Sequence, residues 1–302
     1  MARNLIIGAA TGYNYNQLKP WVESIDEVCG DNVDRVLIVG NISQETRIKL
    51  VAKDFQLINM PDMPGVPIHV GRFLAIYNYL KDTWQDYKFV VTTDVKDVYF
   101  QKNPFDWLEE KIGFDYDSYR LVAGSESMRY EDEPWGNENL MQAYGAYVHE
   151  AFKQNEIYNV GTIGGHVEYV KDLMFNIFFN SVNRPIPIVD QAVYNVLLKT
   201  QPYKGVTYFA TQSDGWACQA GTTADPSKMN QFRPHLLEAE PTFENGLVLT
   251  GQDSDSPLVL SPKGTPFVIV HQYDRVPEWK KYIMKKYKQE DESQYFNYRI
   301  GT

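Results

Sequence analysis

Apolar runs of strand length alternate with helix-like patterns through the first two-thirds of this 302-residue sequence. A parallel strand pair needs a long crossover, usually a helix, so this alternation favours a mainly parallel sheet with helices on both faces. The expected strands span residues 4–10, 35–40, 56–60 and 88–93. The sequence therefore predicts an α/β fold, in which ligands bind beyond the carboxyl ends of the strands.

Helical spacing of apolar residues separates the expected strands. The first helix is expected from Leu18 to Val28, with Pro20 near its start, where a missing N–H is tolerated. Ser43 is the expected N-cap of the second helix. A stripe from Phe73 to Leu80 predicts a third helix, directly before the strand at 88–93.

The pattern changes after about residue 205. Before that point, residues 120–124 are expected to form a strand, and residues 140–148, 170–178 and 190–199 to form helices. Beyond it, short strands are expected at 207–210, 246–250, 257–260 and 266–270, between Gly, Pro, Ser and Asp clusters. We therefore expect a smaller, β-rich C-terminal part. Because the sequence has neither repeats nor a long linker, residues 1–302 are expected to form one domain.

Composition excludes several classes of function. The net charge is −10, with lysines clustered only near the C-terminus, so no nucleic-acid partner is expected. The 14% aromatic content suits core packing and also stacking on sugars or bases. Cys29 and Cys218 are too few for a disulfide framework or a zinc site, and free thiols are expected, with one disulfide as the alternative. The sequence contains neither an apolar run long enough to span a membrane nor a signal peptide, which predicts a soluble, cytoplasmic protein.

Asp94 and Asp97 follow the apolar strand at 88–93. Two close carboxylates repel each other unless a positive charge lies between them, and Mg²⁺ and Mn²⁺ prefer oxygen ligands. The alternative is that Asp94 caps the next turn and Asp97 is merely exposed. The Asp pairs at 115–117 and 253–255 lie in loop or turn sequences, which makes them weaker candidates.

Six motifs resemble those of GT-A-fold glycosyltransferases, in the expected order along residues 4 to 275. They are "IIGAATGY" (6–13), "VGRFLAIYNYL" (70–80), "VVTTDVKDVYFQKNPF" (90–105), "NVGTIGG" (159–165), "VDQAVYN" (189–195) and "VIVHQYDR" (268–275). The resemblance implies a GT-A, Rossmann-like sheet. In that arrangement, residues up to about 110 form the nucleotide-binding half, about 111–285 the acceptor and sugar half, and 286–302 a tail.

The resemblance implies a divalent metal site, occupied by Mn²⁺ or Mg²⁺. Asp94, Asp97 and His271 would be its ligands. The usual motif is Asp-x-Asp, whereas Thr92 stands two residues before Asp94 here, so that either Asp94 acts as the last Asp of the motif or both aspartates share the metal.

The resemblance also implies a nucleotide site. It would be formed by Ala10, Thr11, Gly12, Tyr13, Arg72 and Thr93. Gly12 allows close backbone approach, and Tyr13 can stack on a base, with an exposed loop aromatic as the alternative. Lys96 and Arg275 are further candidates for pairing with phosphate, and surface or scaffold ion pairs are the alternative role for these basic residues.

Asp190 and Glu126 are the expected catalytic carboxylates. The alternative role for Asp190 is to cap the helix that it opens. The sugar and acceptor site would be formed by Trp135, Asn159, Gly161, Gly164, Gly165 and Gln191. The Asp-Gln element and the late histidine resemble retaining families more than inverting ones. A plain turn is the other explanation for the Gly164–Gly165 pair.

The resemblance implies a glycosyltransferase that moves a sugar from a nucleoside-diphosphate sugar, with UDP as the default nucleotide, to a glycan or protein acceptor. A sugar-1-phosphate nucleotidyltransferase is a second hypothesis, although residues 8–16 lack the basic residue its first loop normally carries. A non-catalytic carbohydrate-binding protein is a third hypothesis. The remaining histidines are expected to be structural or exposed, with only His166 near enough to the glycines to reach a sugar: His69, His149, His166 and His235.

Overall fold

The computed structural model describes residues 2–114, 118–238, 249–250 and 258–289. The Asp pairs at 115–117 and 253–255, the start of the expected strand at 246–250 and most of the tail at 286–302 lie outside these ranges.

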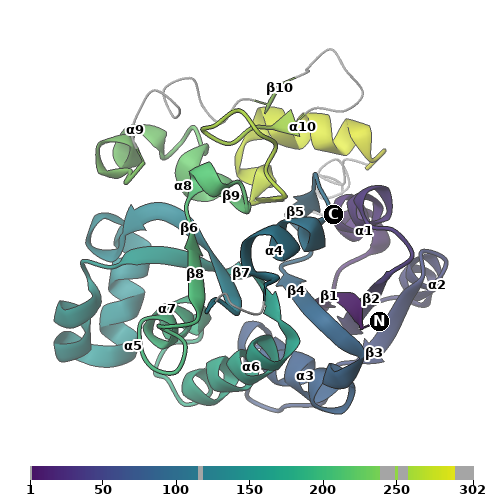
Figure 1. Ribbon diagram of the computed structural model, residues 1–302, viewed down its shortest axis with the longest axis horizontal. Coiled ribbons are helices and arrows are strands. Elements are labelled where there is room, and N and C mark those ends of the chain that lie inside the picture. The colour runs from purple at the N-terminus through teal and green to yellow at the C-terminus, as the bar shows by residue number, and fades with distance from the viewer. Residues whose placement is uncertain (1, 115–117, 239–248, 251–257, 290–302) are drawn as a thin grey trace, which may run out of the picture.

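Within the described residues, seven strands form the main sheet (Figure 1). Their spatial order is β3 (Phe55–Asn59), β2 (Val33–Val39), β1 (Arg3–Ala10), β4 (Tyr87–Thr93), β7 (Glu156–His166), β6 (Leu121–Arg129) and β8 (Thr207–Ala210). All pairs are parallel except those of β7, which is antiparallel to both β4 and β6. The predicted mainly parallel sheet is confirmed, but the strand at 207–210 belongs to it rather than to the C-terminal part.

Helices cover both faces of this sheet. Alternating residues of β1 show why, since Leu5 and Ile7 enter one buried cluster while Ile6 enters another on the opposite face. The first cluster contains residues of α3 (Ile68–Thr83), α6 (Val167–Ser181) and α7 (Asp190–Leu198), and the second contains residues of α1 (Tyr15–Val28), α2 (Gln44–Val51) and α4 (Pro104–Ile112). The result is a three-layer α/β arrangement, as expected.

The helix ends follow local sequence signals. The Ser43 side chain accepts a hydrogen bond from the Thr46 amide at 3.2 Å, so the predicted N-cap is confirmed. Helix α1 begins at Tyr15, before the predicted start, because Asn14 and Gln17 form a capping box. Pro20 therefore lies inside α1.

Helix α5 (Pro134–Phe152) contains the predicted helix at 140–148. Its backbone is interrupted at Gly145, where φ is 76° and ψ is 173°. A left-handed φ of this kind costs glycine little, which explains why the break falls there.

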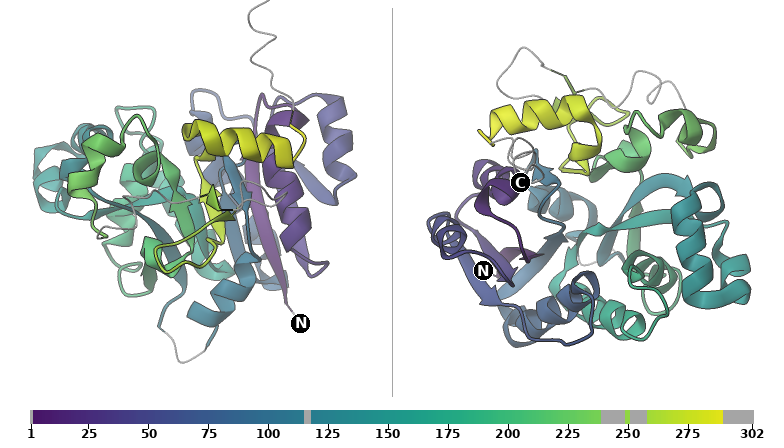
Figure 2. Two further views of the ribbon diagram at one scale, coloured as in Figure 1. Left: turned by 90° about the horizontal axis from the view of Figure 1, so that it is seen from above. Right: turned by 180° about the vertical axis from the view of Figure 1, so that it is seen from behind.

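The C-terminal part forms a smaller layer beside the main sheet. Strand β12 (Ile269–His271) pairs with β5 (Val98–Phe100) on one side and β9 (Ala217–Gln219) on the other, and β10 (Leu249–Thr250) pairs with β11 (Leu258–Val259). The short helices α8 (Ala220–Thr223) and α9 (Met229–Phe232) and the longer α10 (Pro277–Lys286) gather on the same side of the molecule (Figures 1 and 2). The predicted β-rich part is thus present as a mixture of short strands and helices.

Two further expectations can be compared with the described residues. Cys29 and Cys218 are both buried and free. None of the helices in the described ranges has the length and apolar character needed to cross a membrane.

Candidate active site

A cavity of about 660 Å³ lies between the main sheet and the C-terminal part. The carboxyl ends of β1 and β4 open into it, which is where open α/β sheets bind their ligands. Eleven predicted site residues line it: Thr11, Tyr13, Arg72, Asp94, Asp97, Glu126, Trp135, Asn159, Asp190, Gln191 and His271. The structure therefore brings most of the predicted nucleotide, metal and sugar residues to one place.

Six other predicted site residues do not line this cavity: Ala10, Gly12, Thr93, Gly161, Gly164 and Gly165. The Thr93 hydroxyl is buried and accepts a hydrogen bond from the Trp21 indole at 2.8 Å. Gly164 and Gly165 belong to β7 in the middle of the sheet, where Gly164 pairs with Val91 and Val122, rather than to a turn.

The Gly164 position has a packing role instead. A Cβ there would lie 2.7 Å from the Trp216 ring. A Cβ on Gly165 would lie 2.4 Å from the Arg120 carbonyl oxygen, and its φ is 157°. Both glycines thus allow neighbouring groups to approach β7 within the core, and the structure places them away from the cavity wall.

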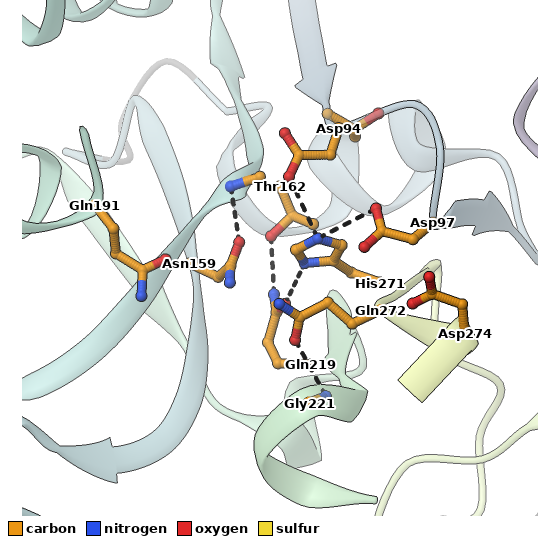
Figure 3. A network of polar contacts seen from close by, with 12 residues as sticks. Asp94, Asp97, Asn159, Thr162, Gln191, Gln219, Gly221, His271, Gln272 and Asp274 are labelled. Carbon is orange, nitrogen blue, oxygen red and sulfur yellow. Dashed lines mark hydrogen bonds and ion pairs between the residues drawn. The ribbon is translucent and has the colours of Figure 1, made fainter. Parts of the chain in front are cut away.

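Asp94, Asp97 and His271 form a group in which one ligand atom from each lies within 4.8 Å of the others (Figure 3). Asp94 directly follows β4, Asp97 directly precedes β5, and His271 ends β12. The His271 Nε2 atom is 3.5 Å from Asp94 Oδ2 and 3.8 Å from Asp97 Oδ1. Two carboxylates and an imidazole are a donor set that suits a divalent cation such as Mn²⁺ or Mg²⁺.

The protonation chemistry of this group fits a cation. Burial raises the pKa of Asp97, and the Asp94 charge raises it further. Burial would also raise the pKa of Asp94, but Arg72 and His271 together hold it below its ordinary value. Burial disfavours a charged His271, yet the two aspartates raise its pKa. The three groups therefore favour a shared positive charge, which a metal ion would supply.

Gly161 leaves room for these ligands. A Cβ at this position would lie 2.8 Å from Asp94 Oδ2 and 2.9 Å from His271 Cε1. The Gly161 carbonyl accepts a hydrogen bond from the Asp94 amide at 3.0 Å, and its own amide donates to Asn159 Oδ1 at 2.7 Å. Although Gly161 does not line the cavity, its lack of a side chain leaves space for Asp94 and His271, and its carbonyl holds the Asp94 amide.

Arg72 connects Asp94 with Asp190. One guanidinium nitrogen bonds Asp94 Oδ1, and the other lies 3.2 Å from Asp190 Oδ2. The Asp190 side chain is only 7% exposed, and burial raises its pKa although Arg72 opposes that rise. No side-chain cap is formed at the start of α7, so the N-cap alternative for Asp190 does not apply.

Glu126 lies in the cavity wall on β6. Its Oε1 atom accepts hydrogen bonds from Asn159 Nδ2 at 2.7 Å and Gln191 Nε2 at 3.0 Å. Burial raises the pKa of Glu126, and the two amide donors oppose that rise. Ser127, the next residue, has a φ of 56° at an irregular point of β6, which turns the strand beside Glu126.

The loop after β1 forms another part of the wall. Gly12 has a φ of 72° and its amide donates to the Asn41 carbonyl at 2.8 Å. The Thr11 hydroxyl accepts from the Asn41 amide at 3.2 Å. Burial raises the pKa of Tyr13, and Asp94 and Asp97 add to this effect, so the phenol stays protonated near the metal group. This loop is held rigid beside the aspartates.

Several cavity residues were not predicted from the sequence. They include Ile68, Glu133, Ile188, Thr222, Asp225, Lys228, Gln272 and Asp274, whereas Lys96 and Arg275 were among the candidates for phosphate contacts. Lys228 is exposed and precedes a four-residue helix, so nothing in its sequence context distinguishes it from a surface lysine. Gln272 has a φ of 59°, and no local sequence pattern predicts this left-handed conformation.

His69 also lines the cavity, and its Nε2 atom contacts the Pro187 carbonyl oxygen. The other histidines are held elsewhere. His166 Nε2 lies 2.9 Å from the Ile112 carbonyl oxygen, His149 Nε2 lies 2.7 Å from Asn137 Oδ1, and His235 Nδ1 lies 3.2 Å from Asp132 Oδ1. These three do not line the cavity, so His166 is not placed at the predicted sugar site.

No family model and no curated protein sequence matches this chain. Solved structures do. The apo structure of the bifunctional glycosyltransferase WbbM matches with a TM-score of 0.58 and 13% identity, over 96% of this chain and 52% of that one. This chain has the GT-A glycosyltransferase fold. It spans about half the length of the WbbM chain.

The galactosyltransferase LgtC, solved with donor and acceptor sugar analogues, matches with a TM-score of 0.53 and 13% identity. This match covers 93% of the present chain and 95% of LgtC. The GT-A likeness thus extends over nearly the whole chain, as the order of the six motifs predicts.

Proposed function

We propose that this chain is a glycosyltransferase that moves a sugar from a nucleoside-diphosphate sugar to a glycan or protein acceptor. The proposal includes dependence on Mn²⁺ or Mg²⁺ and UDP as the nucleotide. The observation that carries it is the Asp94, Asp97 and His271 group, which lies at a wall of a 660 Å³ cavity in a GT-A fold. The cavity is large enough to hold a nucleotide sugar, since small-molecule sites span roughly 300–1,000 Å³.

We assign the diphosphate of the donor to the cavity wall formed by Asp94, Asp97 and His271. A divalent ion held by Asp94, Asp97 and His271 would contact the diphosphate oxygens and stabilise the negative charge on the leaving group. Lys96, Lys228 and Arg275 are further basic residues that line the cavity, and they suit the remaining phosphate charge.

The donor sugar is placed between Arg72 and the amides beside Glu126. Arg72 holds Asp190 at 3.2 Å, and Asp190 is the carboxylate that we assign to the reacting sugar. Asn159 and Gln191 each donate to Glu126, so Glu126 orients two side chains that can bind sugar hydroxyls. Asp190 and Glu126 are the proposed catalytic residues: Asp190 is the carboxylate assigned to the reacting sugar, and Glu126 is the second candidate for that role.

We assign the nucleotide and the acceptor to different elements of the cavity wall. Thr11 and Tyr13, in the fixed loop after β1, suit the ribose and the base. Trp135, at the start of α5, is half exposed and lines the cavity, which suits a sugar acceptor. We infer retention of configuration from the order Asp190–Gln191 and the late His271, in which case the leaving diphosphate accepts the proton of the acceptor hydroxyl.

Calorimetric titration tests the donor site. UDP and GDP are each titrated, with and without Mn²⁺, into the protein and its Asp94→Ala variant. Asp82→Ala is the matched control, because Asp82 is an exposed aspartate on α3 that does not line the cavity. We expect one nucleotide to bind only with Mn²⁺, and this binding to be lost in Asp94→Ala and kept in Asp82→Ala.

The same titration separates the competing functions. A carbohydrate-binding protein would ignore both nucleotides, and that result would overturn the proposal. A nucleotidyltransferase would bind a nucleoside triphosphate and release pyrophosphate with a sugar 1-phosphate, so an assay with those substrates distinguishes it. Release of UDP from a UDP-sugar, stimulated by an added glycan, would support the transferase.

A further inference from the structure

Gln219 and His271 stand side by side on neighbouring strands. Strands β9 and β12 are parallel, and their register pairs these two residues directly. Register partners project to the same face of a sheet, so both side chains point toward the metal group (Figure 3). Both residues are almost fully buried, with 0% and 2% exposure. The contact between them is therefore shielded from water and fixed in geometry.

A chain of hydrogen bonds passes through Gln219. The His271 Nδ1 atom lies 2.7 Å from Gln219 Oε1, and Gln219 Nε2 donates to Thr162 Oγ1 at 2.9 Å. The Thr162 side chain is on β7 and fully buried. The amide nitrogen of Gln219 faces Thr162, and its amide oxygen faces the imidazole. An oxygen can only accept a hydrogen bond, so the Nδ1 atom carries a hydrogen.

This arrangement decides which histidine nitrogen is free. In the neutral ring that a metal ion requires, a hydrogen on Nδ1 leaves the Nε2 lone pair free, and Nε2 lies 3.5 Å from Asp94 Oδ2 and 3.8 Å from Asp97 Oδ1. Metal-binding histidines commonly donate their other ring N–H to an acceptor that fixes the tautomer and the ring orientation. The acceptor here is a neutral amide, which adds no further negative charge to a site that already holds two aspartates.

We propose that Gln219 is a positioning residue of the metal site, which holds His271 in its Nδ1–H tautomer by accepting a hydrogen bond from Nδ1 at its Oε1 atom. The inference rests on the proposed function only in requiring that the Asp94, Asp97 and His271 group binds a divalent cation. Gln219 is not among the residues that line the cavity, so it is assigned no contact with the substrate. Its effect is on the affinity for the metal.

The inference is tested by measuring the binding of Mn²⁺ to the nucleotide-free protein with electron paramagnetic resonance. Gln219→Met keeps the length of the side chain and removes the acceptor, and the Mn²⁺ dissociation constant is expected to rise about 10- to 100-fold. Gln219→Glu keeps an acceptor at Nδ1, and the Thr162 hydroxyl can rotate to donate to the new carboxylate. This variant is expected to bind Mn²⁺ at least as tightly as the unchanged protein.

Gln212→Met is the matched control for loss of a buried glutamine. Gln212 is also 0% exposed, and its amide donates to the Ser125 carbonyl at 2.7 Å. We expect this variant to lose thermal stability while keeping its Mn²⁺ affinity. If Gln219→Met fails to fold, the comparison of Gln219→Glu with the unchanged protein still reports on the acceptor at Nδ1.

Nitrogen-15 NMR of the histidine rings shows which nitrogen of His271 carries the hydrogen. A role of Gln219 in packing alone would not determine that position. The signal of His271 is assigned by comparison with a His271→Gln variant, and the Mg²⁺-loaded protein is expected to carry the hydrogen on Nδ1. A hydrogen on Nε2, or unchanged Mn²⁺ affinity in Gln219→Met, would overturn the inference. If the unchanged protein binds no Mn²⁺ at all, the metal requirement of the proposed function fails instead, and the inference with it.

Discussion

The cavity is built from two regions that reach it in different ways. In the N-terminal region, Thr11 and Asp94 directly follow strands β1 and β4 of the main sheet, and Arg72 lies near the start of α3. In the C-terminal region, His271 arrives on a three-residue strand, whose partners are β5 and β9. The first region is positioned by parallel topology, and the second by pairing between segments far apart in the sequence.

Strand β5 joins these two regions. It begins directly after Asp97, and its Val98 pairs with His271 across the antiparallel β5–β12 ladder. The Gln272 amide also donates to the Asp97 carbonyl at 2.8 Å. The motif at 94–98 thus provides two carboxylates and also the strand that fixes the third ligand. The position of His271 relative to Asp94 and Asp97 therefore depends on the short β5–β12 ladder.

The largest expected effect tests whether both regions are required. Asp94→Ala and His271→Ala should each lower the rate of sugar transfer by about 10³-fold, since metal stabilisation of the leaving group is worth several kcal/mol. Initial rates of UDP release measure this effect, with Asp82→Ala as the control. If only the Asp94 variant loses activity, the C-terminal region is not part of the metal site and the comparison fails.

Arg72→Met tests the charge balance of the N-terminal region. Removing Arg72 leaves the buried Asp190 and the partly exposed Asp94 without their cation, and an uncompensated buried carboxylate typically costs about 3 kcal/mol. Urea denaturation without metal measures the free energy of unfolding. Arg3→Met is the control, since its pair with Asp34 is exposed and worth about 1 kcal/mol or less. Equal losses in both variants would contradict the role given to Arg72.

Gly161→Ala tests the close approach of Asp94 and His271, one from each region, to strand β7. Its methyl group would lie within 3 Å of both Asp94 and His271, so these ligands must shift. Overpacking of about 1–3 kcal/mol would weaken Mn²⁺ binding about tenfold. Gly164→Ala is the matched control on the same strand, because its methyl group meets Trp216 rather than the ligands. It should lower stability and leave the Mn²⁺ affinity of the folded protein unchanged, whereas equal affinities in both variants would refute this explanation.

Trp135→Ala tests the proposed acceptor contact at the start of α5. Loss of an aromatic contact worth about 1 kcal/mol should raise the KM for a glycan acceptor about fivefold. The affinity for UDP should stay the same. Tyr147→Ala is the control on the same helix, since Tyr147 is 90% exposed and does not line the cavity. A weaker affinity for UDP in the Trp135 variant would place this residue at the donor instead.

The smallest effect is a pH dependence outside the cavity. Burial lowers the pKa of His166 below its ordinary value of 6.5, so the unfolded chain binds the proton more readily than the folded chain. Stability should therefore fall as the pH drops below about 6.5 and through the lower pKa of the folded state. His166→Gln should flatten this part of a curve of melting temperature against pH. An unchanged slope would show that another group is responsible.

The sequence predicted much of the N-terminal region because its signals are local. The run at 88–93 was expected to end in a ligand site, and Asp94 does follow β4 into the cavity. The cap at Ser43 was readable from the residue type alone. Apolar alternation and capping depend on neighbouring residues, so they survive without knowledge of tertiary contacts.

The remaining parts depend on long-range packing, which no local pattern contains. The glycines of "NVGTIGG" suggested either a segment that lines the sugar pocket or a plain turn, but they belong to the interior strand β7, where Gly164 accommodates Trp216 and only Asn159 and Val160 of this segment line the cavity. Gln219 was not singled out, since its role depends on the register of β9 with β12. A buried glutamine next to a strand that ends in histidine would be visible only once that pairing is known.

The proposed metal site can be tested with a crystal grown with Mn²⁺ and UDP, in which the anomalous scattering of manganese locates the ion. We predict one manganese peak bounded by Asp94, Asp97 and His271 Nε2, with the diphosphate of UDP on its open side. A manganese peak elsewhere in the cavity, or UDP bound without contact to these three residues, would contradict the proposed metal site.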